Sequence, residues 1–585
     1  MKNKGVLKNL MLTRFGAETL SKQTPLGEYP RPQMRRDSYL CLNGKWRCVI
    51  KDGAGREKYD GEIYVPFSPE TLLSGVLCGV KPGDTMTYSA EFEIPEGFLN
   101  AVTLLHFGAV DYECSVRFNG VNVGGHKGGY TAFTLDVTGA VKTGLNRITV
   151  KVSDPSDTGV QSRGKQKLKS GGIWYTPQSG IWQTAWMESV PSEYVRDFTL
   201  IPDIDAGTLT VKFDANATRA LVEAYDDGIP AAAAVSKDGI ATIVLPGFEC
   251  WSPEHPKLYD LKITAGEDSV YSYFAMRKFS VGTDGNGVKR LFLNNKPYFH
   301  KGVLDQGYWS DGLLTPPSDE AMVYDITLMK KLGFNMLRKH IKIEPARWYY
   351  HCDRLGMLVW QDMVCGGGKY KTLAVAVAPF LGFTKDDSNY GFFSRRDKAG
   401  REEYERDLAD TVKQLKNAPC IAMWVPFNEG WGQFDSTRIA ALVKTLDPTR
   451  TVDNVSGWYD QGEDSGDFKS LHIYFRAVKL PKDKRVILLS EFGGYSLKVA
   501  GHVYDSERSF GYKMLETRED YEKAYADLIE NEILPAIPQG LSAVVYTQLS
   551  DVEQEINGFV TFDRAAEKAD RAAIKAVNDK MVLPS

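Results

Sequence analysis

Two glutamates end apolar runs in the second half of the chain. Glu429 follows IAMWVPFN and Glu491 follows RVILLS. A single glutamate in such a place is most often a solvated loop residue, but two facing carboxyl groups can cleave a glycosidic bond. One carboxyl protonates the leaving oxygen while the other attacks the anomeric carbon or activates water. The pair therefore predicts glycoside hydrolysis, provided that the fold brings the two side chains together.

Asn428 directly precedes Glu429. Its amide can donate a hydrogen bond to a sugar hydroxyl such as the 2-OH, where such bonds strengthen in the transition state. In a (β/α)8 barrel, polar residues that end the strands gather at one face. If the two glutamates end the fourth and seventh strands, they lie across the barrel from each other. Their carboxyls can then approach to about 5 Å, the separation typical of retaining glycosidases.

The second half of the chain has the alternation of strand and helix patterns that such a barrel requires. From about residue 288, amphipathic helical segments alternate with short apolar ones. The helix expected over 318–332 begins with SDE, an N-cap followed by acids, and ends with basic residues and glycine. Eight segments read as strands: 298–303, 334–339, 356–362, 420–428, 451–455, 469–474, 485–491 and 542–548. This pattern predicts a C-terminal (β/α)8 TIM barrel over 282–585.

The first half of the chain reads as all-β. Short runs of alternating apolar and polar residues, such as YSAEFEIP and NRITVKV, fill about 36–190 and predict a β-sandwich of the jelly-roll type. A shorter series over 191–281 has the length of an immunoglobulin-like β-sandwich. We therefore predict a multidomain chain with limits 1–190, 191–281 and 282–585. The run GTDGNG at 282–287 is expected to act as a hinge.

Composition excludes several classes of partner. The formal net charge is −4, which gives no electrostatic footprint for nucleic acid or an anionic membrane. The eight cysteines form no CxxC pair and no zinc-type cluster with histidine, so we expect no metal site and no cofactor. No segment is apolar enough for a signal peptide or a membrane span, which favours a cytoplasmic protein. A homo-oligomer is left open.

At the level of motifs, the chain resembles glycoside hydrolase family 2, the group of β-galactosidases, β-glucuronidases and β-mannosidases. The resemblance runs over nearly the whole chain. WSPEHPKLY (251–259) is similar to the end of the family's immunoglobulin-like domain, and NEGWGQ (428–433) and SEFGG (490–494) are similar to its catalytic segments. Four segments resemble its N-terminal sugar-binding domain: LNGKW (42–46), VPFSPETLLSG (65–75), HFGAVDYECSVRFNGVNVGGHKGGYTAF (106–133) and GIWYTPQSGIWQTAWME (172–188).

The resemblance implies roles for individual residues. Glu429 would be the general acid/base and Glu491 the nucleophile of a mechanism that retains the anomeric configuration without a metal. Arg338 and His340 of RKH stand where the family lines its −1 subsite. Each has a structural alternative, an ion pair or a histidine satisfied at a helix start. Tyr474 of LHIY would be a hydrogen-bond partner of Glu491, or else a core residue.

Further candidates flank the other strands. Tyr546 stands where the family usually has a tryptophan platform, and this departure changes the expected stacking on the sugar. Asp305 and Trp309, after the first strand, are expected to contact the substrate, although Asp and Gly are ordinary in such a loop. Asp362, after the third strand, is either a pocket wall or a loop ion pair.

Two segments are candidates for closing the pocket. RGKQKLKSGG (163–172) would lean from the first domain against the barrel mouth, or would be a solvated basic loop. The irregular segment 363–398 is long for a barrel loop, which favours a functional role.

The expected substrate is a carbohydrate. The glucuronidases of the family carry an Asn-x-Lys clamp after the nucleophile, and FGGYSLKVAGHVYDSERSFGY (492–512) has no such triplet. This favours a neutral sugar, and we predict a retaining exo-β-glycosidase, a β-galactosidase in the first place. The alternatives are a β-glucuronidase or another exo-β-glycosidase of the family. A protein of another class, a catalytically silent carbohydrate-binding protein, would be expected to have lost one of the two glutamates. A metal-dependent barrel hydrolase would need a His-x-His strand end, which the chain lacks.

Overall fold

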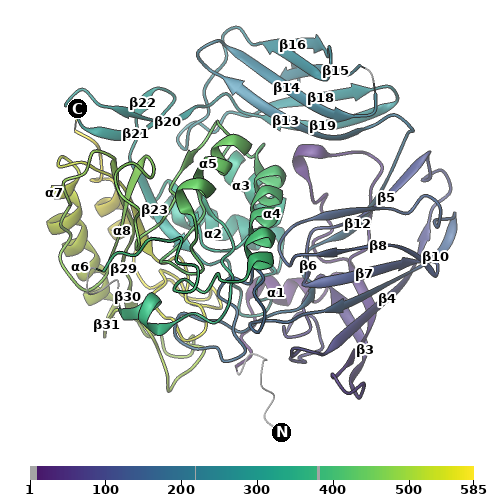
Figure 1. Cartoon of the computed structure of the whole chain (residues 1–585), viewed down its shortest axis with the longest axis horizontal. Helices are drawn as coiled ribbons and strands as arrows, with labels where there is room; N and C mark the ends of the chain where they lie inside the picture. The colour runs from purple at the N-terminus through teal and green to yellow at the C-terminus, as the bar shows by residue number, and fades with distance from the viewer. Residues whose placement is uncertain (1–8, 218, 378–382, 585) are drawn as a thin grey trace.

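A computed structural model describes residues 9–217, 219–377 and 383–584 of the chain. Figure 1 shows three groups of elements in chain order: β-sheets of the N-terminal part, a smaller β-sandwich, and a barrel flanked by helices. Each group encloses a hydrophobic core of its own. The predicted fold class is confirmed.

The N-terminal group is a sandwich of antiparallel strands. One sheet has the order β1-β12-β5-β9, a second has the order β3-β2-β4-β10-β7-β8, and β6 pairs with β11. Side chains of β10 alternate between the core and the surface, as the sequence pattern of NRITVKV predicts. The strands are β1 Leu40–Cys41, β2 Gly44–Lys51, β3 Glu57–Val65, β4 Thr85–Ile94, β5 Val102–Phe107, β6 Val110–Asp111, β7 Glu113–Phe118, β8 Val121–Lys127, β9 Phe133–Asp136, β10 Gly144–Ser153, β11 Gly180–Ile181 and β12 Ala185–Val190. Ahead of them lie helix α1 Arg14–Thr19 and the 3-10 turn Pro32–Met34.

The second group is a two-sheet sandwich, with orders β13-β14-β17 and β16-β15-β18-β19. Its strands are β13 Val195–Asp203, β14 Thr208–Ala215, β15 Leu221–Asp226, β16 Ile229–Val235, β17 Ile240–Val244, β18 Tyr259–Ala265 and β19 Asp268–Phe274. A small sheet follows, formed by β20 Phe279–Thr283, β21 Lys289–Leu293 and β22 Lys296–Pro297. In the run expected as a hinge, residues 282–283 end β20 and pair with β21, and residues 284–287 form the turn between the two strands. The domain limits at 190 and 281 stay predictions.

The third group is an eight-stranded parallel sheet with the order β27-β26-β25-β24-β23-β32-β29-β28. Each strand falls within, or overlaps, one of the eight predicted segments. The strands are β23 His300–Asp305, β24 Met336–Lys339, β25 Leu358–Asp362, β26 Ile421–Val425, β27 Thr451–Val452, β28 Phe468–Ile473, β29 Val486–Gly493 and β32 Leu541–Thr547. Their side chains are almost all buried, as expected for parallel strands covered on both faces.

Helices cover the outside of the barrel. In α2 the side chain of Ser318 accepts the N–H of Ala321 and two lysines lie in the last turn, as the sequence predicts. No helix stands between β27 and β28 or between β28 and β29, a stretch that the structure describes completely. Loops rich in Gly, Asp and Pro take that place because these residues disfavour helix interiors. The helices are α2 Asp319–Lys331, α3 Ala346–Leu355, α4 Lys398–Leu415, α5 Ser436–Leu446, α6 Arg518–Leu528, α7 Leu534–Ala536 and α8 Arg571–Asn578, with π turns at Leu373–Val377 and Ile529–Ile533 and short strands β30 Tyr495–Leu497 and β31 Lys513–Leu515.

Helix α4 joins the barrel to the N-terminal sandwich. Figure 1 shows it on the side of the barrel that faces strands β5 to β8 and β12. The Tyr112 hydroxyl donates to Glu403, and Gln414 accepts the backbone N–H of Ala132 at 3.0 Å. Among the described residues, no helix is both long and apolar enough to cross a membrane.

Candidate active site

Glu429 and Glu491 reach the same place from different strands. Glu491 lies within β29, and Glu429 lies four residues beyond the end of β26. The backbone of Glu429 is left-handed, with φ at 50°, and its N–H donates to the carbonyl of Ser456 at 3.0 Å. A non-glycine residue in this region is strained, and such strain persists where the surroundings hold the chain in place. The loop thus turns the Glu429 side chain inward.

His472, on β28, stands between the two carboxylates. Its Nδ1 lies 2.8 Å from Glu429 Oε1 and 3.5 Å from Glu491 Oε2. One side-chain atom from each of the three residues lies within 4.8 Å of the other two. All three side chains are buried. The carboxylates are therefore as close as the retaining mechanism requires.

The surroundings shift the two acids in opposite directions. Burial opposes the ionisation of Glu491, but the charges of His472 and Arg338 outweigh it and hold the pKa of Glu491 at about 2. Burial raises the pKa of Glu429, and the negative charge of Glu491 adds to that effect, while His472 and Lys165 act against it. One acid is thus kept ionised while its neighbour holds its proton more tightly, which is the division of roles that acid catalysis needs.

Arg338, on β24, holds the Glu491 side of the cluster. Its fully buried guanidinium donates to Glu491 Oε1 at 3.2 Å and to the backbone carbonyl of Ser490 at 3.0 Å. It also donates to Asp362 Oδ1 at 3.0 Å and to Asn428 Oδ1 at 2.8 Å. Arg338 therefore forms a buried ion-pair network that orients several members of the site at once.

Asn428 and His340 are each held by one contact with a charged neighbour. Because Asn428 Oδ1 is occupied by Arg338, its Nδ2 is a buried donor, and it has no partner within the described part of the chain. The Nδ1 atom of His340 lies 2.7 Å from Asp362 Oδ2. Burial, together with the charges of Lys165 and Arg338, holds the pKa of His340 far below its ordinary value. His340 is thus a neutral imidazole that Asp362 orients.

Tyr474, at the end of β28, completes the cluster. Its hydroxyl donates to Glu491 Oε2 and lies 2.9 Å from Thr547 Oγ1. Its ring stacks on that of Tyr512, with 3.8 Å between centroids and an interplanar angle of 5°. The sequence predicted the partnership of Tyr474 with Glu491, and the geometry agrees with it.

Comparison with known proteins identifies the family to which this geometry belongs. Residues 42–182 match the model described as "Glycosyl hydrolases family 2, sugar binding domain", and residues 287–490 match "Glycosyl hydrolases family 2, TIM barrel domain". Together these ranges cover more than half of the 585 residues. The chain belongs to glycoside hydrolase family 2.

Relatives of this family 2 chain carry different names. A β-galactosidase of Klebsiella pneumoniae is 25% identical over 447 residues, which are 69% of this chain and 39% of the relative. The chain spans half or less of the length of the curated relatives with the strongest matches. Among solved structures, a β-glucuronidase of Ruminococcus gnavus has a TM-score of 0.74 at 17% identity, over 95% of this chain and 98% of that one. A β-galacturonidase of Eisenbergiella tayi bound to galacturonate has a TM-score of 0.71 at 18% identity, over 95% of this chain and all of that one.

Three predicted substrate-contacting residues of the family 2 chain lie outside the cluster. Asp305 accepts hydrogen bonds from Lys339 and from the backbone of Gly307. Trp309 is buried in a small cluster with Phe15 and Ala321, and the Arg564 guanidinium stacks on it at 4.2 Å. The ring of Tyr546 is fully buried among aromatic side chains, and its oxygen accepts the N–H of Tyr495. Within the described residues, no hydrogen bond or ion pair joins any of the three to Glu429 or Glu491.

Sequence reasoning missed three residues of the site: His472, Tyr512 and Lys165. A signal for His472 was present, because side chains two apart on a strand point to the same face and Tyr474 was already a candidate. Tyr512 lies in the 492–512 segment, which was searched only for a clamp triplet. Lys165 lies in the basic stretch whose two interpretations were left open.

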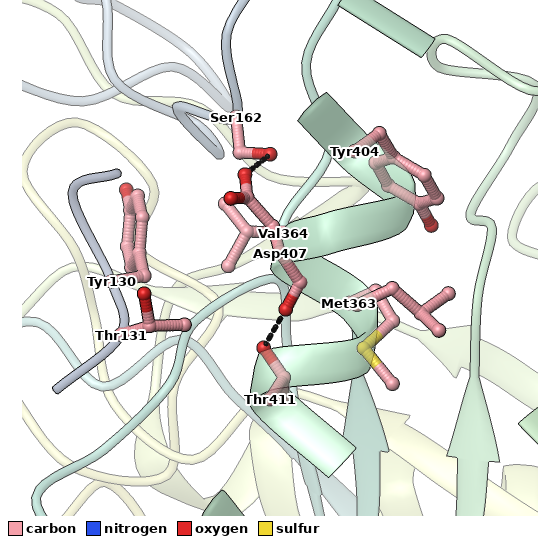
Figure 2. A pocket seen from close by; sticks show the side chains of 9 residues that line it. Tyr130, Thr131, Ser162, Met363, Val364, Tyr404, Asp407 and Thr411 are labelled. Carbon is pink, nitrogen blue, oxygen red and sulfur yellow. Dashed lines mark hydrogen bonds between the residues drawn. The ribbon is translucent and has the colours of Figure 1, made fainter. Parts of the chain in front are cut away.

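The basic stretch of the N-terminal sandwich does lean on the barrel. Figure 2 shows Ser162, just before it, donating to Asp407 of α4, a bond of 2.6 Å. Arg163 donates to the carbonyl of Gly367, and the ring of Trp174 packs against Trp431 at 5.1 Å. The cavity at this junction has a volume of about 10 Å³, so it is a closed joint and not a substrate site.

The irregular segment 363–398 takes part in the same contact. Its residue Tyr370 packs against Trp174 at 5.9 Å and against Trp431 at 6.5 Å. Residues 378–382 of this segment lie outside the described residues. The described part forms one wall of an aromatic group, Trp174, Tyr370 and Trp431, beside the acid/base loop.

Proposed function

We propose that the protein is a retaining exo-β-glycosidase that removes terminal β-linked sugars by double displacement. The observation that carries the proposal is the pair of buried carboxylates, Glu429 and Glu491, whose atoms lie within 4.8 Å and whose pKa values are shifted in opposite directions. In this proposal Glu491 is the nucleophile and Glu429 is the general acid/base.

The steps follow from these positions. Glu429 gives its proton to the glycosidic oxygen while ionised Glu491 attacks the anomeric carbon, so the aglycone leaves and a glycosyl ester forms on Glu491. Glu429, now a carboxylate, takes a proton from the water that attacks the same carbon and releases Glu491. Arg338 and Tyr474 hold Glu491 in line. The free Nδ2 of Asn428 is placed to donate to the 2-OH of the sugar.

The exo mode and the sugar are part of the proposal. The aromatic group and the basic stretch support a pocket closed on one side, which suits removal of a terminal residue. Relatives are named β-galactosidase and β-glucuronidase. We propose a β-galactoside as the first substrate, because the segment after Glu491 has no Asn-x-Lys clamp. A β-glucuronide is the alternative.

A panel of nitrophenyl β-glycosides tests the activity, and azide rescue tests the roles. Wild-type protein should hydrolyse at least one member of the panel. Glu429→Ala should still form the glycosyl ester from a dinitrophenyl glycoside, turn over about 10²–10⁴-fold more slowly, and recover with azide. The azide product should be the β-glycosyl azide, since it arises from the ester on Glu491.

Glu491→Ala is the matched variant, because it removes the other carboxylate of the same pair. It should lose both steps, and any azide product should have the α configuration. If azide gives the same product, or none, with both variants, the assignment of roles is wrong. No turnover by wild type on any glycoside would instead favour a carbohydrate-binding protein.

A further inference from the structure

Lys165 brings a positive charge from the N-terminal sandwich into the active site. It lies on the segment between β10 and β11, and only 6% of the residue is exposed. Its Nζ lies 5.6 Å from the ring centre of Trp431 and 5.6 Å from that of Tyr175. Trp431 follows the acid/base by two residues, and its ring centre is 6.5 Å from that of His340. The ammonium therefore stands beside the residues that would surround the bound sugar.

Within the described residues, Lys165 has no acidic partner. No carboxylate oxygen of these residues lies within 4.0 Å of its Nζ. The other buried lysines nearby are paired: Lys339 contacts Asp305 at 2.7 Å, and Lys342 contacts Glu344 at 2.7 Å. Burying an ammonium without a counter-ion is costly, so buried charges are normally paired or hydrogen bonded. The residue is buried, but its Nζ makes no hydrogen bond within the described residues and is not fully shielded from solvent, so its charge is available to an anionic ligand group.

A second donor at the same place also has no acceptor. The indole Nε1 of Trp431 is buried and has no hydrogen-bond partner within the described part of the chain. Buried polar groups without a partner are rare in folded proteins, and each calls for a physical explanation. The Lys165 ammonium lies 5.6 Å from the centre of the same ring, and an ammonium together with an indole N–H favours an oxyanion over a neutral hydroxyl.

The backbone around Lys165 is held before any ligand arrives. The carbonyl of Lys165 accepts the N–H of Tyr175 at 3.0 Å, and the N–H of Gly164 donates to the carbonyl of Cys365 at 2.9 Å. The carbonyl of Arg163 accepts the Tyr130 hydroxyl at 3.0 Å. With the bond from Ser162 to Asp407 in Figure 2, these contacts fix the segment to both domains. A lysine on such a segment is preorganised for binding.

The field of Lys165 extends to the reacting groups. Its charge is among the causes that lower the pKa values of Glu429, Asp362 and His340. In each case burial is the largest cause of the shift. Lys165 lowers the pKa of the two carboxyls by favouring their ionised form, and it lowers the pKa of His340 because it repels the protonated imidazole. Lys165 is therefore within electrostatic range of all three side chains.

We propose that Lys165 and the indole N–H of Trp431 bind an anionic group of the glycoside, a carboxylate or a sulfate ester. The site thus selects acidic glycosides. The inference rests on the proposed glycosidase function, and among the substrates named there it favours the acidic alternative over the β-galactoside. It also accounts for the missing Asn-x-Lys triplet, because the cation comes from the other domain.

The test compares Lys165→Met with Lys169→Met. Lys169 lies on the same segment and is exposed to solvent, so this control removes the same positive charge at a position outside the site. The kcat/KM of nitrophenyl β-galactoside, β-galacturonide, β-glucuronide and 6-sulfo-β-galactoside is measured for each protein at its own optimal pH. Measuring each protein at its own optimal pH prevents a shift of the pH profile from being taken for a change in specificity. The uronides test recognition of a carboxylate, and the sulfated sugar tests recognition of a sulfate ester.

We expect Lys165→Met to lower the ratio of acidic to neutral kcat/KM by about 10- to 100-fold, mainly through KM. Lys169→Met should leave the ratio within about twofold. Lys165→Arg, which keeps the charge, should retain most of the preference and serves if the methionine variant does not fold. An equal loss on acidic and neutral substrates, or a wild type that prefers the neutral galactoside, would overturn the proposal.

Failure of the glycosidase function gives a different result. If the wild type hydrolyses nothing, binding of free galacturonate, glucuronate and galactose 6-sulfate is measured by calorimetry with the same variants. Weaker binding of the acidic sugars by Lys165→Met, and not by Lys169→Met, would then support the anion site without the activity. Binding that is the same for the three proteins would refute it.

Discussion

The histidine between the two carboxylates allows a quantitative test of the site. Replacing His472 by Asn removes the imidazole while keeping one N–H donor of similar reach. In the wild type, His472 lies 2.8 Å from Glu429 and 3.5 Å from Glu491, and it lowers the pKa of both. Its removal therefore raises both pKa values. In the proposed mechanism Glu429 acts while protonated and Glu491 while ionised, so both limbs of the pH profile move to higher pH.

The size of the displacement can be worked out from the contact. A hydrogen bond to a charged group contributes about 1.5–3 kcal/mol, and 1.36 kcal/mol corresponds to one pH unit. Since Asn keeps part of the hydrogen bond, His472→Asn should move each limb of the kcat/KM profile upward by about one pH unit. His472→Ala, which keeps no donor, should move them by about two.

The assay is kcat/KM for the best aryl glycoside from about pH 2 to pH 10, a range that includes the limb set by Glu491 as well as the limb set by Glu429. His502→Asn is the matched control, because His502 also lies 2.8 Å from a carboxylate, that of Asp563, but outside the cluster. The control should leave both limbs in place. A profile of His472→Asn that keeps its limbs, or moves them to lower pH, would refute the electrostatic role of His472.

Two further predictions concern neighbours of this cluster. Tyr474→Phe removes a donor to Glu491, so it should raise the pKa of Glu491 from about 2. Because the carboxylate also loses a hydrogen bond that orients it, kcat should fall about tenfold. Tyr525→Phe loses a hydrogen bond to Asn578 away from the carboxylates and should leave kcat unchanged, and equal effects of the two variants would count against the role of Tyr474. Burial, with the charges of Glu403 and Asp410, raises the pKa of Asp407 to about 7, so the ionised form destabilises the fold as pH rises from about 4 to 7. Asp407→Asn should therefore raise the thermal midpoint relative to wild type more at pH 8 than at pH 5, and a gain independent of pH would contradict this.

Much of the barrel could be predicted because its signals are local. The apolar run of each strand fixes its position, and all eight predicted segments coincide with strands. The pairing of Glu429 with Glu491 follows from their places on the fourth and seventh strands. The helices missing on either side of β28 could not be read reliably, because alternation elsewhere in the barrel suggested a regular pattern where Gly, Asp and Pro instead form loops.

The less predictable part of the site depends on contacts between distant segments. The exposure of Lys165 is decided by the docking of its segment on the carbonyls of Cys365 and Gly367, for which the local sequence carries no pattern. Trp309 illustrates the converse. Its motif follows a catalytic-face strand, yet its ring packs with Phe15 of α1, from the opposite end of the chain. Such side chains are placed by tertiary packing and not by periodicity.

The hydrogen bond between Ser162 and Asp407 marks a junction at which two separately folded parts of the chain meet. The reacting carboxylates belong to the barrel, whereas the lysine beside them belongs to a β-sandwich that contains neither carboxylate. If the proposed anion site is correct, substitutions in the 163–172 segment change which sugar is accepted without altering Glu429 or Glu491.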